Sequence, residues 1–175
     1  MEGFFNLECY RLGCFVNTPS RVELSKELVE KYKEFLVEDS SQKNVQVYTL
    51  QNAEQLRNER AAGLLRGLVH LRGGAKMAAF GADVSPKVIV FAGMSSANPC
   101  FNNLYIGDGE RPKLNVDLLK ELAEDYKDKL QTPVCIGIRT GYLENEAEVK
   151  ALNGDTFIVD SPIKIVEMFV DKYLK

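Results

Sequence analysis

The chain lacks the features of a membrane or secreted protein. Among its 175 residues, no apolar run approaches the roughly 20 residues that a membrane-spanning helix needs. The N-terminus carries the acidic residue Glu2 where a signal peptide has positive charge, and no long apolar stretch follows. We therefore expect a cytoplasmic protein that makes no membrane contact.

Motifs for metals and cofactors are missing as well. The single histidine, His70, and the four cysteines show neither a C-x-x-C pair nor zinc-ligand spacing. The chain also has neither the Walker pattern G-x-x-x-x-G-K-[ST] nor the dinucleotide pattern G-x-G-x-x-G. We expect no bound metal and no cofactor, and we expect the cysteines to be small, half-buried apolar residues in a reducing compartment. They are Cys9, Cys14, Cys100 and Cys135.

Positive charge is scarce overall but concentrated in the centre of the chain. The 22 Lys and Arg residues are outnumbered by 25 Asp and Glu, which gives a net charge of −3. This balance argues against a protein that coats nucleic acid indiscriminately, since such binding depends on many cation–phosphate contacts. Between residues 57 and 87, however, only Glu59 and Asp83 are acidic, and an anionic partner is expected here. The basic residues of this stretch are Arg57, Arg60, Arg66, Arg72, Lys76 and Lys87.

The most suggestive part of this stretch is residues 72–76, Arg-Gly-Gly-Ala-Lys. Paired glycines leave backbone amides uncovered, and the flanking Arg72 and Lys76 supply two cations, so the segment suits a phosphate group. The alternative is a helix end followed by an ordinary turn, because glycine commonly terminates helices.

An enzyme is the weaker hypothesis. Residues 93–97, Gly-Met-Ser-Ser-Ala, follow an apolar strand and approach the G-x-S-x-G turn that exposes the nucleophilic serine of α/β-hydrolases. Ser95 stands at the position of that serine. However, Ala97 replaces the last glycine, and His70 precedes the serine, whereas the hydrolase order places the histidine after it. We expect a solvated His70 and no catalytic residue, with a small hydrolase that uses Ser95 as a less favoured alternative.

Apolar periodicity and capping residues predict an α+β protein. Residues 45–139 give the order strand, helix, strand, strand, helix, strand, which is that of the ferredoxin-like or modified RNA-recognition-motif sheet (βαββαβ). We expect one domain over residues 1–175, with residues 1–44 adding a strand and a helix and residues 140–175 adding a C-terminal helix. One face of such a sheet stays open and can bind single-stranded RNA or another protein chain. The predicted segments are strands at 4–16, 45–50, 75–82, 87–92 and 133–139, helices at 20–37, 52–72, 115–130 and from Ser161 onward, and a loop at 93–113.

A series of short motifs, taken in order, resembles a known family. The chain resembles the C-terminal half of the CRISPR-associated DevR-type backbone subunits of type I, Cascade-like complexes. The similarity covers roughly residues 4–143. The matching segments are 11–13 (Arg-Leu-Gly), 57–60 (Arg-Asn-Glu-Arg), 64–76 (ending Gly-Gly-Ala-Lys), 83–86 (Asp-Val-Ser-Pro), 98–102 (Asn-Pro-Cys-Phe-Asn) and 134–142 (ending Gly-Tyr).

The resemblance implies a non-catalytic subunit that binds crRNA. Its expected partners are crRNA, other CRISPR effector subunits and further copies of itself along the RNA. By position match, the expected RNA-binding residues are Arg57, Arg60, Arg72, Gly73, Gly74 and Lys76.

The chain also departs from the family. Members are considerably longer, and their first core strand lies in an N-terminal half that has no counterpart here. That strand is expected from residues 4–16, from residues 45–50 or from a partner chain, unless this is a divergent or truncated relative. The alternative function is a protein-interaction module that uses the open sheet face within a multisubunit complex.

Overall fold

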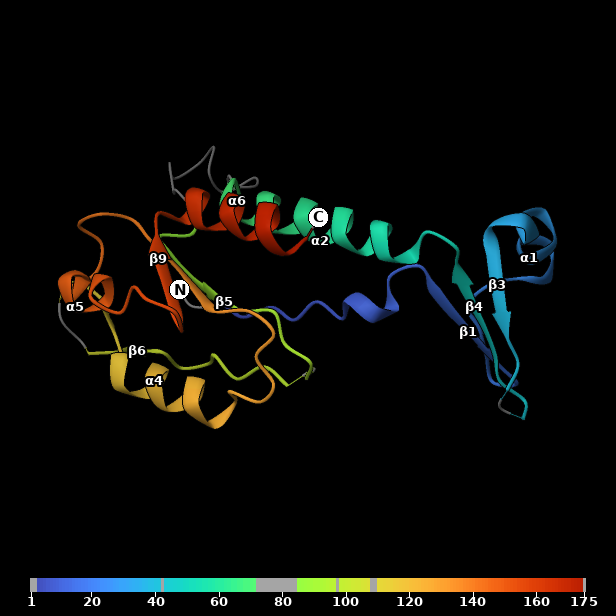
Figure 1. Ribbon diagram of the computed structural model, residues 1–175, viewed down its shortest axis with the longest axis horizontal. Coiled ribbons are helices and arrows are strands. Elements are labelled where there is room, and N and C mark those ends of the chain that lie inside the picture. Colours follow the sequence, from blue (N-terminus) through green and yellow to red (C-terminus); the bar gives the residue numbers. More distant parts are fainter. Residues whose placement is uncertain (1–2, 42, 72–84, 97, 108–109, 175) are drawn as a thin grey trace. The chain divides into compact units, whose positions relative to one another are not determined.

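The computed structural model describes residues 3–41, 43–71, 85–96, 98–107 and 110–174. It is a mixed α+β chain (Figure 1). The chain packs as two compact units. The N-terminal unit is Leu7–Ala61, and the C-terminal unit is Ala62–Lys175 together with Met1–Asn6. The boundary falls within helix α2 (Ala53–Val69).

The N-terminal unit is built on a four-stranded antiparallel sheet of order β2-β1-β4-β3. Phe15 lies opposite Tyr48, and Val16 lies opposite Val47. A 3-10 turn η1 (Cys9–Arg11) precedes the sheet, and helix α1 (Lys26–Lys31) and the 3-10 turn η2 (Lys33–Phe35) connect its two hairpins. The strands are β1 (Cys14–Thr18), β2 (Arg21–Val22), β3 (Leu36–Asp39) and β4 (Gln46–Leu50).

The helix predicted over 20–37 is wrong for most of its length. The backbone N–H of Arg21 donates to the Thr18 hydroxyl at 3.1 Å, which closes a turn, and β2 returns antiparallel to β1. The carboxylate of Glu23, which stands three residues after Ser20 as in a capping box, instead accepts from the Val16 backbone at 2.8 Å. Strand pairing therefore overrides the capping pattern. The helix begins only after Ser25, whose hydroxyl accepts from Leu28 N at 3.3 Å.

The strand predicted over 4–16 is also shorter than expected. It begins at Cys14, because η1 and Gly13 interrupt it. Gly13 has a φ of +72°, a left-handed conformation that side chains disfavour. This glycine turns the chain into β1.

The C-terminal unit contains a three-stranded sheet of order β5-β8-β9, in which β5 runs antiparallel and β9 parallel to the central β8. The helices predicted near 115 and 161 are confirmed with their caps. Asn115 accepts from Leu118 N at 3.1 Å, and Ser161 accepts from Lys164 N at 3.5 Å. The elements are β5 (Val88–Phe91), β6 (Tyr105–Ile106), β7 (Lys113–Leu114), α4 (Val116–Asp125), β8 (Val134–Ile138), α5 (Glu146–Lys150), β9 (Phe157–Asp160) and α6 (Pro162–Tyr173).

Both faces of this three-stranded sheet are covered. Along β8, alternate residues point to opposite faces. Val134 and Ile136 pack in a core with Leu119 of α4, while Cys135 packs in a second core with Phe169 of α6. The second core also takes the end of α2 from Ala62 onward. Every residue of β8 is buried as a result, so this sheet does not offer the open face expected of it.

The strand at 45–50, expected to start the core of residues 45–139, pairs elsewhere. As β4 it pairs with β1 and β3, its neighbours along the chain, and not with β5 or β8. The predicted strand at 75–82 lies outside the described residues. A four-stranded sheet over residues 45–139 therefore stays a prediction.

Candidate nucleic-acid interface

Helix α2 carries three of the arginines in the basic stretch. Its buried residues include Ala61, Leu65 and Val69, whereas Arg60 and Arg66 are exposed and Arg57 is half-buried. Nothing in the sequence distinguishes these three arginines, but their surroundings in the structure differ.

Arg57 is half-buried and holds the backbone that leads into β1. Its Nε donates to the Leu12 carbonyl at 3.1 Å, and its Nη2 donates to the Tyr10 carbonyl at 3.0 Å. Two carbonyls that no strand or helix uses are satisfied in this way, which is what buried backbone requires. Arg57 is thus a structural anchor within the N-terminal unit, and its forked donors are largely committed.

Arg66 is neutralised by a carboxylate that the sequence did not indicate. Its Nε and Nη2 donate to both carboxylate oxygens of Glu167 on α6, with N–O distances of 2.7 to 3.1 Å. The hydrogen bond from Arg66 lowers the pKa of Glu167, and the same bond raises the pKa of Arg66. The two residues are 101 positions apart, so no local pattern reveals the pair.

Arg60 remains available. It is exposed, and within the described part of the chain its guanidinium has neither an ion pair nor a hydrogen-bond partner. Of the arginines on α2, it alone is open to an external anion. The other expected RNA-binding residues, Arg72, Gly73, Gly74 and Lys76, lie outside the described residues.

Ser95 does not lie on a nucleophile turn. Its hydroxyl donates to the Lys129 carbonyl at 3.3 Å, and its backbone N–H donates to the same oxygen at 2.9 Å. Met94 forms a bridge with Leu130. After β5 the chain bends at Ser95 and Ser96, and among the described residues that follow Ser95 no helix begins before Val116. The strand–turn–helix arrangement that exposes a nucleophilic serine is therefore not formed.

The predicted loop at 93–113 is packed against the sheet and is not a free loop. Cys100 and Leu104 are buried, and β6 pairs with β7 to form a small hairpin. The Asn115 backbone N–H also donates to the Leu104 carbonyl at 2.7 Å. Most of this segment serves to cover one face of the sheet.

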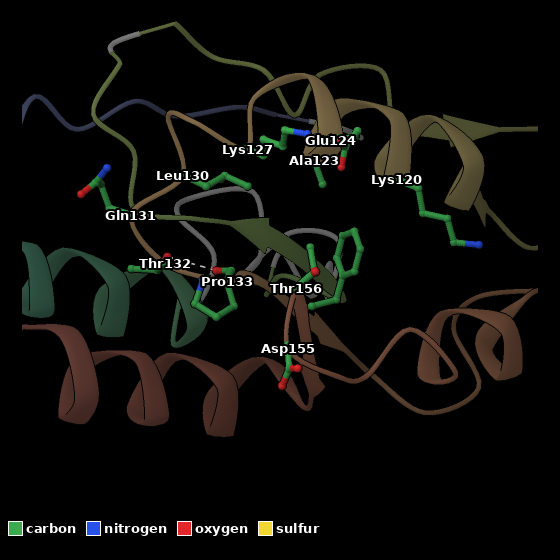
Figure 2. Close-up of a pocket in the computed structure, with 11 residues that line it drawn as sticks. Lys120, Ala123, Glu124, Lys127, Leu130, Gln131, Thr132, Pro133, Asp155 and Thr156 are labelled. Carbon is green, nitrogen blue, oxygen red and sulfur yellow. Dashed lines mark hydrogen bonds and ion pairs between the residues drawn. The ribbon is translucent and has the colours of Figure 1, made fainter.

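A hollow of about 610 Å³ lies between α4, the start of β8 and the turn before β9 (Figure 2). Its volume falls in the range of small-molecule sites. Figure 2 shows Lys120 extending away from the other lining side chains, while Lys127 pairs with Glu124. The polar groups do not converge on a common point, so the hollow does not indicate a specific ligand.

The two buried cysteines have unreactive thiols. Burial raises the pKa of the Cys135 thiol to about 12, and burial also raises the pKa of Cys100. In the described parts of the chain, no three His, Cys, Asp or Glu side chains gather in a way that could hold a metal ion. No helix there is both long and apolar enough to cross a bilayer.

No protein-family model, curated protein or solved structure matches this chain.

Proposed function

We propose that this protein is a non-catalytic RNA-binding subunit, and specifically a crRNA-binding backbone subunit of a type I CRISPR effector complex. The observation that carries the proposal is Arg60, an exposed guanidinium on α2 that has no partner among the described residues. A guanidinium can bind a phosphate through two parallel hydrogen bonds. An exposed arginine that pairs with no carboxylate among the described residues is therefore a good phosphate ligand.

In this proposal, Arg60, Arg72 and Lys76 hold backbone phosphates, and the amides of Gly73 and Gly74 add uncharged donors. Such contacts position the RNA without reading its bases. Arg57 acts indirectly, by fixing the chain beside α2. A ferredoxin-like arrangement of residues 45–139 belongs to the same proposal, and so do other effector subunits and further copies of the chain as partners along the RNA.

The direct test is binding of a crRNA-like single strand measured by fluorescence anisotropy at several salt concentrations. Each phosphate contact on a single strand contributes about 0.7 to the slope of log affinity against log salt. Three contacts predict that affinity falls about twentyfold between about 50 and 200 mM salt. An affinity that does not change with salt, or no binding at all, contradicts the proposal.

Two arginines of the same helix provide a matched pair of variants. Arg60→Ala removes an unpaired charge and is expected to weaken RNA binding and to reduce the slope by about 0.7. Arg66→Ala removes the same charge from a guanidinium that Glu167 already neutralises, so its affinity is expected to stay close to wild type. The double variant Arg72→Ala/Lys76→Ala is expected to lose about twice the slope of Arg60→Ala. If Arg60→Ala and Arg66→Ala weaken RNA binding equally, the affinity depends only on the net charge of the protein.

A protein-interaction module is the second candidate, and one observation on the N-terminal sheet favours it. By strand register, Cys14, Val16, Val37, Val47 and Thr49 lie on the same face of this sheet, and none of them is buried. Val37 is 54% exposed. A co-purified protein that binds the chain without RNA, and is lost on Val37→Lys, distinguishes this function from the first.

A further inference from the structure

The ends of β5 and β8 bring two cations together at one edge of the sheet in the C-terminal unit. The Arg139 backbone N–H donates to the Lys87 carbonyl at 2.8 Å, which continues the β5–β8 pairing beyond Val88 and Ile138. Residues paired directly across antiparallel strands place their side chains on the same face. Lys87 and Arg139 therefore project from one face, side by side.

Strand alternation identifies this face. Ile138 packs in the core with α4, so Arg139 points to the opposite face, where Gly137 meets the start of α6. The same face carries Asp160, which lies opposite Gly137 in the β8–β9 register. Asp160 is exposed, and its carboxylate accepts from the Ser161 backbone at 2.6 Å.

Arg139 has no counter-charge among the described residues. It is half-buried, yet in the ranges that the structure describes no carboxylate lies within ion-pair distance of its guanidinium, and no other hydrogen-bond partner is found for it. Charged groups that lose solvent are normally paired. An anion from outside the chain would supply the missing partner. The Lys87 ammonium donates to the Ser85 hydroxyl at 3.0 Å, and its positive charge lies on the same face as Arg139.

We propose that Arg139, assisted by Lys87, binds a further phosphate of the RNA backbone. This inference rests on the proposed function, because it takes RNA as the source of the phosphate. It extends that function to an edge of the sheet that the motif comparison did not assign to RNA. Arginine suits the position better than lysine, because its planar fork bonds two phosphate oxygens at once.

The test uses the full chain and the same crRNA-like strand, with Arg139→Gln, Lys87→Gln and a control that also removes one charge. Arg139→Gln is expected to weaken binding about tenfold, the size of one charge-assisted hydrogen-bonded contact, and to reduce the salt slope by about 0.7. Lys87→Gln is expected to have a smaller effect of the same sign. The control Lys120→Gln removes a charge from α4, on the opposite side of the sheet, and is expected to leave affinity unchanged. Circular dichroism melting checks that each variant is folded.

A second variant, which removes a negative charge from the same face, keeps the test decisive if Arg139→Gln does not fold. Asp160→Asn removes the acid on the same face and leaves an amide oxygen that can still accept from Ser161, so RNA binding is expected to tighten. If wild type binds RNA but neither Arg139→Gln nor Asp160→Asn changes the affinity, the inference is overturned while the proposed function stands. If wild type binds no RNA, both fail. If inorganic phosphate at millimolar concentration displaces the RNA as readily from Arg139→Gln as from wild type, Arg139 is not a phosphate ligand.

Discussion

Gly137, at the centre of the sheet in the C-terminal unit, is the position where a single added methyl group should do the most damage. A Cβ at this position would lie 2.7 Å from the Cα of Pro162, 2.7 Å from Ile89 Cγ2 and 2.9 Å from Ile165 Cγ2. The two isoleucine side chains can rotate away, but the Cα of Pro162 belongs to the backbone of the first turn of α6 and cannot. We therefore expect Gly137→Ala to push α6 off the sheet or to strain β8.

The magnitude follows from two opposing effects. Overpacking a well-packed core costs about 1–3 kcal/mol, and contact with backbone on one side and with two side chains on the others places this case at the upper end. Alanine restricts the unfolded chain more than glycine does, which returns about 0.4–1 kcal/mol. The net expectation is a loss of about 2 kcal/mol in the free energy of unfolding.

Urea denaturation followed by circular dichroism measures this loss. With a slope of about 1–3 kcal/mol per molar urea, the midpoint should fall by about 1 M. Gly63→Ala is the matched control, because Gly63 lies in helix α2 with nothing within 4 Å of its added Cβ. That substitution should stabilise the protein by about 0.5–1 kcal/mol. If both variants shift the midpoint in the same direction, close packing at Gly137 is not what places α6.

Three further predictions concern single side chains. Arg57→Ala removes two hydrogen bonds to backbone carbonyls and should destabilise the N-terminal unit by about 1.5–3 kcal/mol. Amide exchange in the variant should then be faster in β1 than in β8. Equal exchange in the two strands would speak against Arg57 as a structural anchor. The pKa of Glu167 is lowered by Arg66, so the pair contributes stability above the ordinary pKa of a glutamate, and this contribution is lost as pH falls through the lowered pKa. Melting of Glu167→Gln beside wild type should therefore show a difference near neutral pH that disappears in acid, and a difference that persists in acid would contradict the pairing. Cys135, whose pKa burial raises to about 12, should resist iodoacetamide in the native protein at pH values where exposed Cys9 is alkylated, as peptide mass spectrometry can establish.

Local rules predicted β5, α4, β8 and α6 of the C-terminal unit, where local and tertiary preferences agree, but they missed the short elements β6, β7, α5 and β9. Asn115 and Ser161 cap the helices where the sequence places them, and the apolar run of residues 133–139 is a buried strand. β9 was missed although Phe157, Ile158 and Val159 form a run of residues that favour strands. Its four residues are too few for the pattern to stand out between polar segments.

The N-terminal unit was predicted less well, because tertiary contacts decide its structure. Glu23 stands three residues after Ser20, as in a capping box, but it accepts a hydrogen bond from β1 instead. The candidate site shows the same limitation. Residue type and spacing find the arginines of α2, but neither can show that Arg57 is committed to two carbonyls or that Arg66 is committed to Glu167.

This distinction decides how many charges are left for RNA. A chain of net charge −3 attracts a polyanion only through cations that its own carboxylates do not neutralise. Arg57 and Arg66 have partners within the chain, whereas Arg60 and Arg139 have none among the described residues. With Arg72 and Lys76, one phosphate for each of these four cations predicts a salt slope of about −2.8 for wild type. A slope near −1.4 would match only two contacts, and the Arg60→Ala and Arg139→Gln variants would then show which part of the surface the RNA does not reach.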